Sequence, residues 1–145
     1  MSKIKGIIHP VPSNIAERIY AGKRFIVFKS LLRKAKPGLT FILYESKGAG
    51  AFTGWANIVS IKKMDSIELW KQYGDLLPLN KSEYGNYIGK KPIVDLIEID
   101  HFQYFNEKFI PSKSISMRGR YIDEEEFIEI TCWVKKYGVK EKLEI

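Results

Sequence analysis

The sequence contains a single cysteine among its 145 residues, which excludes an internal disulfide. The neighbours of Cys132 are mostly apolar or β-branched, so we expect its thiol to be buried and inert. There are only two histidines, His9 and His101, and they lie far apart in the sequence. Because a zinc site takes three or four ligands, the sequence predicts no metal site, and nothing in it indicates another cofactor.

The sequence also lacks a long hydrophobic run. No apolar stretch approaches the roughly 20 residues that cross a bilayer. The N-terminus carries basic residues but only a short apolar run, Gly6 to Ile8, which is not typical of a signal peptide. We therefore expect a cytoplasmic protein without a membrane partner. The length predicts one domain over residues 1–145.

Positive charge is the strongest compositional feature that is present. Lysine and arginine number 24 against 17 acidic residues, a formal net charge of +7. Residues 18–36 hold seven basic side chains and no acidic one, whereas residues 123–129 hold five acidic ones. This polarity favours a partner that carries phosphate groups. The alternative is a lysine-rich, ion-paired surface of the kind that thermophilic proteins carry.

A helix, a glycine and a basic strand follow one another between Ser13 and Lys29. Ser13 is a suitable N-cap, and the apolar residues after it recur at helical spacing. Gly22 is suited to end this helix, because glycine adopts the left-handed conformation without a Cβ penalty. The aromatic and β-branched run at 25–28 predicts a buried strand. This corner would hold Lys23 at the mouth of a sheet, in reach of an anionic ligand.

The rest of the chain alternates short strands with helices. Asp65, Asn80 and Asp123 each stand three residues before a glutamate, which is the spacing of a capping box. The segment 124–137 favours a helix, although its β-branched residues are also compatible with a strand. Strands are expected at 4–8, 39–45, 51–61 and 92–100. Periodicity alone therefore predicts an α+β fold that is mostly β, and the short strand spacing suggests a small barrel.

Short motifs of the chain resemble known families. Gly22 and Lys23, followed by Lys29, resemble the Gly-Lys segment of the ASCH group of PUA-like domains. The stretches HPVPSNIAERIYAGK (residues 9–23) and KPGLTFILYESKGAGAFTGWANI (residues 36–58) are similar to an archaeal uncharacterised family of that superfamily. The resemblance implies a small mixed, mostly antiparallel β-barrel with three to four short helices. It also implies a domain that binds RNA or a modified nucleotide.

The candidate site is a pocket between the first helix, the Lys23 corner and the third and fourth strands. Lys23 and Lys29 would meet phosphate or a base carbonyl as point charges. Trp55 would offer its ring face for base stacking. Arg118 and Arg120 would clamp a backbone phosphate. The predicted nucleic-acid-binding residues are Lys23, Arg24, Lys29, Lys47, Trp55, Arg118 and Arg120.

Each of these residues also has a purely structural interpretation. Lys23 would cap the carbonyl groups of the preceding helix, and Lys29 would keep an edge strand soluble. Trp55 would belong to the core. Arg118 and Arg120 would be ordinary loop charges.

An enzymatic function in the same pocket is the first alternative. Some ASCH-like proteins are amide hydrolases on modified cytidine, and the resemblance implies a lysine, a threonine three residues later and a glutamate. Lys23 matches the lysine, but Ile26 stands at the threonine position and has no hydroxyl. We therefore lean towards a binding protein rather than an enzyme. A ribonuclease using Lys23, Lys29 and Glu45 stays open, because acid–base catalysis needs only suitably placed groups.

A protein-interaction adaptor is the second alternative. It would bind its partner through exposed aromatic side chains such as Tyr84, Tyr87 or Phe105 rather than through cations. Its binding would depend little on salt, whereas phosphate binding weakens steeply as salt rises.

Overall fold

The computed structural model describes residues 3–47, 49–100 and 102–140, which form eight strands and four α-helices. The strands are β1 (Gly6–Val11), β2 (Phe25–Phe28), β3 (Thr40–Glu45), β4 (Ala51–Asp65), β5 (Ile93–Ile99), β6 (Gln103–Phe109), β7 (Arg120–Ile122) and β8 (Val139–Lys140). The helices are α1 (Ser13–Tyr20), α2 (Ser66–Tyr73), α3 (Lys81–Ile88) and α4 (Glu124–Tyr137), with a 3₁₀ turn η1 (Gly74–Leu76) between α2 and α3.

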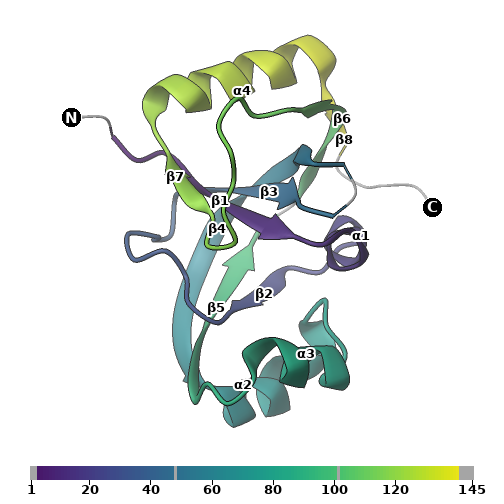
Figure 1. The fold of residues 1–145 in the computed structure, drawn as a ribbon, viewed down its shortest axis with the longest axis vertical. Coiled ribbons are helices and arrows are strands. Elements are labelled where there is room, and N and C mark those ends of the chain that lie inside the picture. The colour runs from purple at the N-terminus through teal and green to yellow at the C-terminus, as the bar shows by residue number, and fades with distance from the viewer. Residues whose placement is uncertain (1–2, 48, 101, 141–145) are drawn as a thin grey trace.

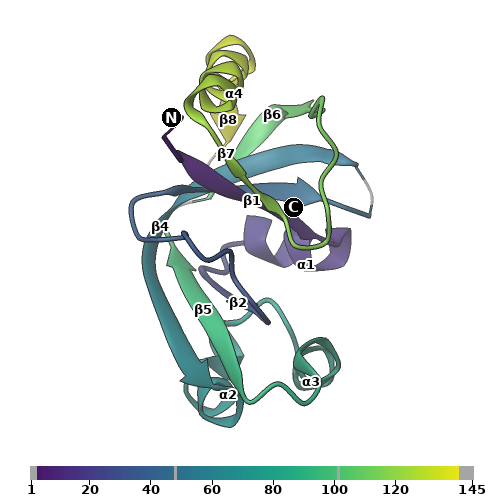
Figure 2. The same ribbon diagram turned by 60° about the vertical axis from the view of Figure 1, so that its left-hand side comes forward.

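The strands form one curved, mostly antiparallel sheet. Six of them follow the order β2-β5-β4-β3-β1-β7, and β6 and β8 extend from β4. β1 and β3 pair in parallel, whereas the other described pairs are antiparallel. Helix α4 lies at one end of the molecule and α2 and α3 lie at the other (Figure 1), and the turned view shows the same separation (Figure 2). The predicted α+β, barrel-like class is confirmed, although the sheet does not close.

The long strand β4 connects the two halves of the molecule. Its first residues pair with both β3 and β6, and its later residues, from Ile58 onward, pair with β5. Gly54 lies close to the start of β6, since a Cβ there would stand 2.3 Å from the Phe102 ring and 2.5 Å from the Gln103 carbonyl oxygen. This close approach explains why no larger residue fits at this position.

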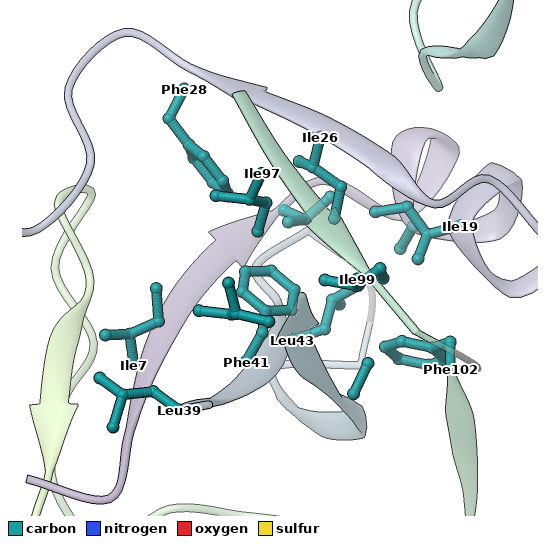
Figure 3. Packing of buried hydrophobic residues seen from close by; sticks show 14 of the residues in the cluster. Ile7, Ile19, Ile26, Phe28, Leu39, Phe41, Leu43, Ile97, Ile99 and Phe102 are labelled. Carbon is teal, nitrogen blue, oxygen red and sulfur yellow. The ribbon is translucent and has the colours of Figure 1, made fainter. Parts of the chain in front are cut away.

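The main hydrophobic core lies inside the curved sheet. Figure 3 shows side chains from β1, β2, β3 and β5 converging there with Ile19 of α1. Ile26, Phe28 and Phe41 are among the buried members. A second cluster lies under α2 and α3 and includes Val27 on the opposite face of β2. Because side chains alternate along a strand, the four residues of β2 serve both clusters.

A third cluster packs α4 against the sheet. Its buried members come from β1, β3, β4, β6, β7 and α4, and Trp55 and Phe127 pack against them. The helical interpretation of 124–137 is thereby confirmed, with the Asp123 carboxylate accepting a hydrogen bond from the Glu126 N–H at 2.9 Å. Asp65 and Asn80 cap α2 and α3 as predicted.

Four local predictions were wrong. The N-cap of α1 is Pro12, and the Ser13 hydroxyl donates instead to the Lys47 carbonyl across to the β3–β4 turn. β1 runs on to Val11 through Pro10, because its pairing with β3 continues there and Pro10 needs no partner on the β7 side. β4 extends to Asp65. Cys132 is exposed, because it lies on the outer face of α4.

Candidate functional site

A cleft of about 410 Å³ lies where the sheet fails to close. Among the described strands, β1 pairs with β3 and β7, and β2 pairs only with β5, so no ladder joins β1 to β2 in that part of the chain. The cleft opens along this seam, with the end of β1 and the start of α1 on one side and β2 on the other. Helix α3 and the segment Pro78–Leu79 complete its walls. The local sequence places these elements, but the seam itself arises from the pairing of distant strands.

The walls of the cleft are mainly apolar. Val11, Ile26 and Phe28 line its floor and are buried. Two exposed amide side chains, Asn14 of α1 and Asn86 of α3, also line the cleft. Each amide offers both donors and an acceptor. An apolar slot with a few polar groups is the usual form of a small-ligand site.

His9 forms part of the same wall and is uncharged at neutral pH. Its ring packs on Phe28 with centroids 4.3 Å apart, and its Nδ1–H donates to the Pro10 carbonyl at 3.0 Å. Burial lowers the pKa of His9 to about 4, although the bond to Pro10 acts in the opposite direction. The neutral ring thus contributes a flat surface and an Nε2 acceptor rather than a charge.

The low pKa of His9 makes stability depend on pH. The unfolded chain takes up the proton near pH 6.5 and the folded protein only near pH 4. The free energy of unfolding should therefore fall as pH drops through this window, by about 3 kcal/mol in total, at about 1.4 kcal/mol per pKa unit. Urea unfolding between pH 7 and pH 4 should show a shallower decline for His9→Gln than for the wild type. Identical declines would contradict the assignment.

An ion pair joins the two helices beside the cleft. Arg18 of α1 donates to the Glu83 carboxylate of α3 at 2.5 Å and to the Pro78 carbonyl at 2.9 Å. This contact with Arg18 lowers the pKa of Glu83, helped by the Asn80 backbone N–H. Arg18 is therefore engaged in holding the walls together.

Tyr87 lines the cleft, and Lys29 contacts Tyr87 from outside the lining. The Lys29 backbone N–H donates to the Tyr87 hydroxyl at 3.2 Å, which ties the end of β2 to α3. Burial raises the pKa of Tyr87. The Lys29 Nζ lies 5.7 Å from the centre of the Tyr87 ring, within cation–π range, and the lysine is exposed. A cation thus lies next to one residue of the cleft wall.

The other cations of the predicted corner lie elsewhere. Lys23 donates from Nζ to the Asp75 carbonyl at 2.8 Å and lines a shallow depression near η1, outside the cleft. Arg24 is exposed at the start of β2. Lys47 is exposed in the β3–β4 turn, where its carbonyl accepts from Ser13. Of this group, Lys29 contacts Tyr87, a residue of the cleft wall.

Trp55 and Arg120 are occupied by internal contacts. The Trp55 ring packs against Phe105 and Phe127, and its Nε1–H donates to Gln103 at 2.9 Å. Arg120 forms a two-pronged ion pair with Glu126, at 2.5 and 2.7 Å, so its guanidinium faces α4. Arg118 is exposed and lines a small pocket with the loop after β2.

Glu45 and Lys23 do not form a pair in the described part of the chain. Glu45 instead accepts from the Tyr20 hydroxyl at 2.8 Å, and Tyr20 also contacts the Thr53 hydroxyl. Burial raises the pKa of Tyr20 strongly, so the phenol stays protonated and serves as the donor. His101, the second histidine, lies outside the described residues.

The aromatic set proposed for an adaptor is not exposed as expected. Tyr84 and Phe105 are 5% and 1% exposed, which corrects that expectation, and Tyr87 lines the cleft. Asn14 and Asn86, which line the cleft, were missed because nothing local marks them. Only the packing of α3 over the β1–β2 seam gives them a common position.

Comparisons with known proteins agree with this architecture. Residues 4–124 match the family described as Domain of unknown function (DUF365). No curated protein matches the sequence. The ASCH crystal structure from Zymomonas mobilis is 15% identical, with a TM-score of 0.80 over 88% of this chain and 94% of that chain.

Two single-residue variants of the same Zymomonas mobilis protein match as well. One has a TM-score of 0.79 at 14% identity over 88% of this chain and 97% of that chain. The other has a TM-score of 0.81 at 15% identity over 91% and 98% of the two chains. These similarities show that the chain has the ASCH, PUA-like fold. No helix of the described residues is long and apolar enough to span a membrane.

Proposed function

The chain belongs to the family described as Domain of unknown function (DUF365), and we propose that it binds RNA by holding one base, unmodified or modified, in the β1–β2 cleft. The observation that carries this proposal is the apolar slot with two exposed amides and a lysine next to its wall. The resemblance to PUA-like domains, which implies RNA binding, supports the same class of ligand.

The chemistry of the cleft fits a nucleobase. A base has flat apolar faces, which Ile26, Phe28 and Leu79 can contact, and polar edges, which need donors and acceptors. Asn14 and Asn86 provide both from opposite sides of the slot. Lys29 beside the cleft wall, on a chain with a net charge of +7, favours the attached phosphates.

The positions of the predicted catalytic groups support binding rather than hydrolysis. Lys23 donates to the Asp75 carbonyl, and Glu45 accepts from Tyr20, so each is held by a different partner. Ile26 faces the cleft where the hydrolase pattern would require a hydroxyl. Neither Lys23 nor Glu45 is among the residues that line the cleft, and Ile26, which lines it, has no hydroxyl.

Filling the cleft should weaken the proposed binding of RNA. Asn86 is exposed on α3, so Asn86→Trp would place an indole in the slot without disturbing the core. We expect at least about a tenfold loss of affinity, since stacking alone contributes about 1–3 kcal/mol per base. The measurement is fluorescence anisotropy with a labelled, mixed-sequence single-stranded RNA of a dozen or so nucleotides.

The matched control is Gln72→Trp, which adds the same side chain to an exposed position of α2 away from the cleft. It should bind RNA as the wild type does. Equal affinities for Asn86→Trp and the wild type would show that RNA binds outside the cleft. No binding at low salt would show that RNA is not the ligand. Shortening of the RNA during the assay, absent in Asn86→Trp, would favour a ribonuclease instead.

A further inference from the structure

A second, smaller pocket holds two arginines from distant parts of the chain. It has a volume of about 270 Å³ and is lined by Ser30, Leu31, Leu32, Arg33 and Arg118. Arg33 follows β2, whereas Arg118 lies in the turn before β7. Folding thus brings two guanidinium groups to the same hollow, where like charges repel one another unless an anion lies between them.

No described acidic residue lines this pocket, and the nearby Asp95 carboxylate is buried and paired with Lys63. The lining includes a hydroxyl and two leucines. Within the described ranges, the ion pairs of the protein involve neither Arg33 nor Arg118. Both arginines are exposed and therefore accessible to a ligand. Guanidinium groups favour planar, two-pronged contacts with phosphate oxygens.

The loop that carries Ser30 and Arg33 is held in place by its backbone. The Leu31 N–H donates to the buried Asp95 carboxylate at 2.9 Å, and the Lys34 N–H donates to the Tyr121 hydroxyl at 2.7 Å. The backbone on both sides of Arg33 is therefore fixed. This reduces the ordering cost of ligand binding.

The turn that carries Arg118 is held equally firmly against β1. Gly119 has φ +75° and donates its N–H to Ser116 at 3.0 Å. A Cβ at Gly119 would stand 2.0 Å from the Ile8 carbonyl oxygen, so the turn lies directly on the backbone of β1. Arg118 is thereby placed beside the β1 residues that lead into the cleft.

The pocket adjoins one end of the cleft. Phe28 and His9, whose rings are in contact, line that end, and Ser30 follows Phe28 by two residues. Two residues of extended chain span at most about 7 Å. Gly119 approaches β1 at Ile8 and His9, so both arginine-bearing segments reach the same end. Exposed Lys29 lies between the cleft and the pocket in the sequence.

We propose that Arg33 and Arg118, with the Ser30 hydroxyl, bind the phosphodiester group of the RNA nucleotide next to the base in the cleft. This inference rests on the proposed function and assigns a second subsite to it. It replaces the predicted Arg118–Arg120 clamp, because Arg120 is paired with Glu126. The shared chemistry is a phosphate group, which either RNA or free phosphate can supply.

The first experiment tests phosphate binding without RNA. Inorganic phosphate is titrated into ¹⁵N-labelled protein, and sodium chloride of matched ionic strength is the reference. We expect saturable NMR shifts of the Arg33 and Arg118 side-chain N–H signals and of the Ser30 amide, and we expect the Ser30 amide shift to disappear in Arg33→Gln/Arg118→Gln. Equal shifts with chloride, or unchanged shifts in the double variant, would overturn the pocket as a phosphate site.

The second experiment distinguishes RNA from free phosphate. The affinity for the labelled RNA is measured between about 50 and 200 mM salt for the wild type and for the double variant, with circular dichroism confirming folding. Loss of one phosphate contact should weaken binding about tenfold and reduce the slope of log K against log salt by about 0.7. The control, Lys108→Gln/Lys113→Gln, removes the same charge from exposed positions elsewhere and should change the slope less.

The outcomes separate the two proposals. Phosphate shifts combined with unchanged RNA affinity in the double variant would assign the pocket to free phosphate and overturn the RNA subsite. A reduced slope in the double variant together with a loss of affinity in Asn86→Trp supports both proposals. If the wild type binds no RNA, the proposed function fails, and the RNA subsite fails with it. The phosphate titration then decides separately whether the pocket binds phosphate.

Discussion

Replacing Glu126 with alanine should lower the free energy of unfolding by about 3 kcal/mol. The Glu126 carboxylate is paired with both terminal nitrogens of Arg120, and the two side chains are 11% and 22% exposed. Its removal leaves a mostly buried cation without an acidic partner, which typically costs about 3–5 kcal/mol when burial is complete. The Arg120 Nε is already buried without a hydrogen-bond acceptor among the described residues. Few alternative contacts can therefore compensate.

Urea unfolding of Glu126→Ala and Glu125→Ala tests this expectation. Glu125 is exposed in the same first turn of α4, so its replacement removes a similar helix-dipole contribution without breaking the pair. We expect a loss of only a few tenths of a kcal/mol for Glu125→Ala. Replacing both partners, in Arg120→Met/Glu126→Leu, should recover much of the stability, because no unpaired charge remains. Similar losses for the two glutamate variants would show that the pair contributes little.

Gly119→Ala should lower the free energy of unfolding by about as much as Glu126→Ala, for a different reason. The new Cβ would stand 2.0 Å from the Ile8 carbonyl oxygen, and φ is +75°, where residues with a Cβ are disfavoured. Backbone strain of this kind costs about 1–3 kcal/mol, and the clash with β1 adds to it. The turn must then move away from β1, which disturbs the pairing of Ile8 with Arg120 in β7.

The control variant Gly50→Ala separates the cost of backbone strain from the cost of the steric clash with β1. Gly50 also has a positive φ, +61°, but nothing lies within 4 Å of an added Cβ. Its replacement should therefore cost about 1 kcal/mol from backbone strain alone. Chemical unfolding of both variants gives the comparison. If Gly119→Ala were no less stable than Gly50→Ala, the close contact between the turn and β1 would be wrong.

Local signals in the sequence predicted the elements whose causes are local. Asp65 and Asn80 accept hydrogen bonds from the first turns that follow them, so their spacing alone indicated α2 and α3. Gly22 has φ +122° at the end of α1, as expected for a glycine that ends a helix. The run 25–28 forms β2 with the predicted bounds. These features depend on a few consecutive residues and on general backbone preferences.

Signals that depend on distant segments were missed. Pro10 suggested the end of a strand, but parallel pairing of β1 with β3 carries the strand past it. Nothing near Lys23 in the sequence indicated its contact with the Asp75 carbonyl, which α2 and η1 bring into reach. The cleft itself needs α3 to pack beside β2, and no motif within α3 encodes that position. Sequence reasoning therefore predicted the fold class, whereas the position of the cleft depends on contacts between distant segments.

The two sides of the cleft belong to different hydrophobic clusters. Ile26 and Phe28 belong to the cluster inside the sheet, whereas Tyr87 packs on the cluster under α2 and α3. Separately packed clusters tend to open as separate cooperative units. A ligand that contacts both sides would stabilise the closed arrangement and couple the two units. Occupancy of the cleft would then slow amide exchange in α3 although the helix itself is unchanged.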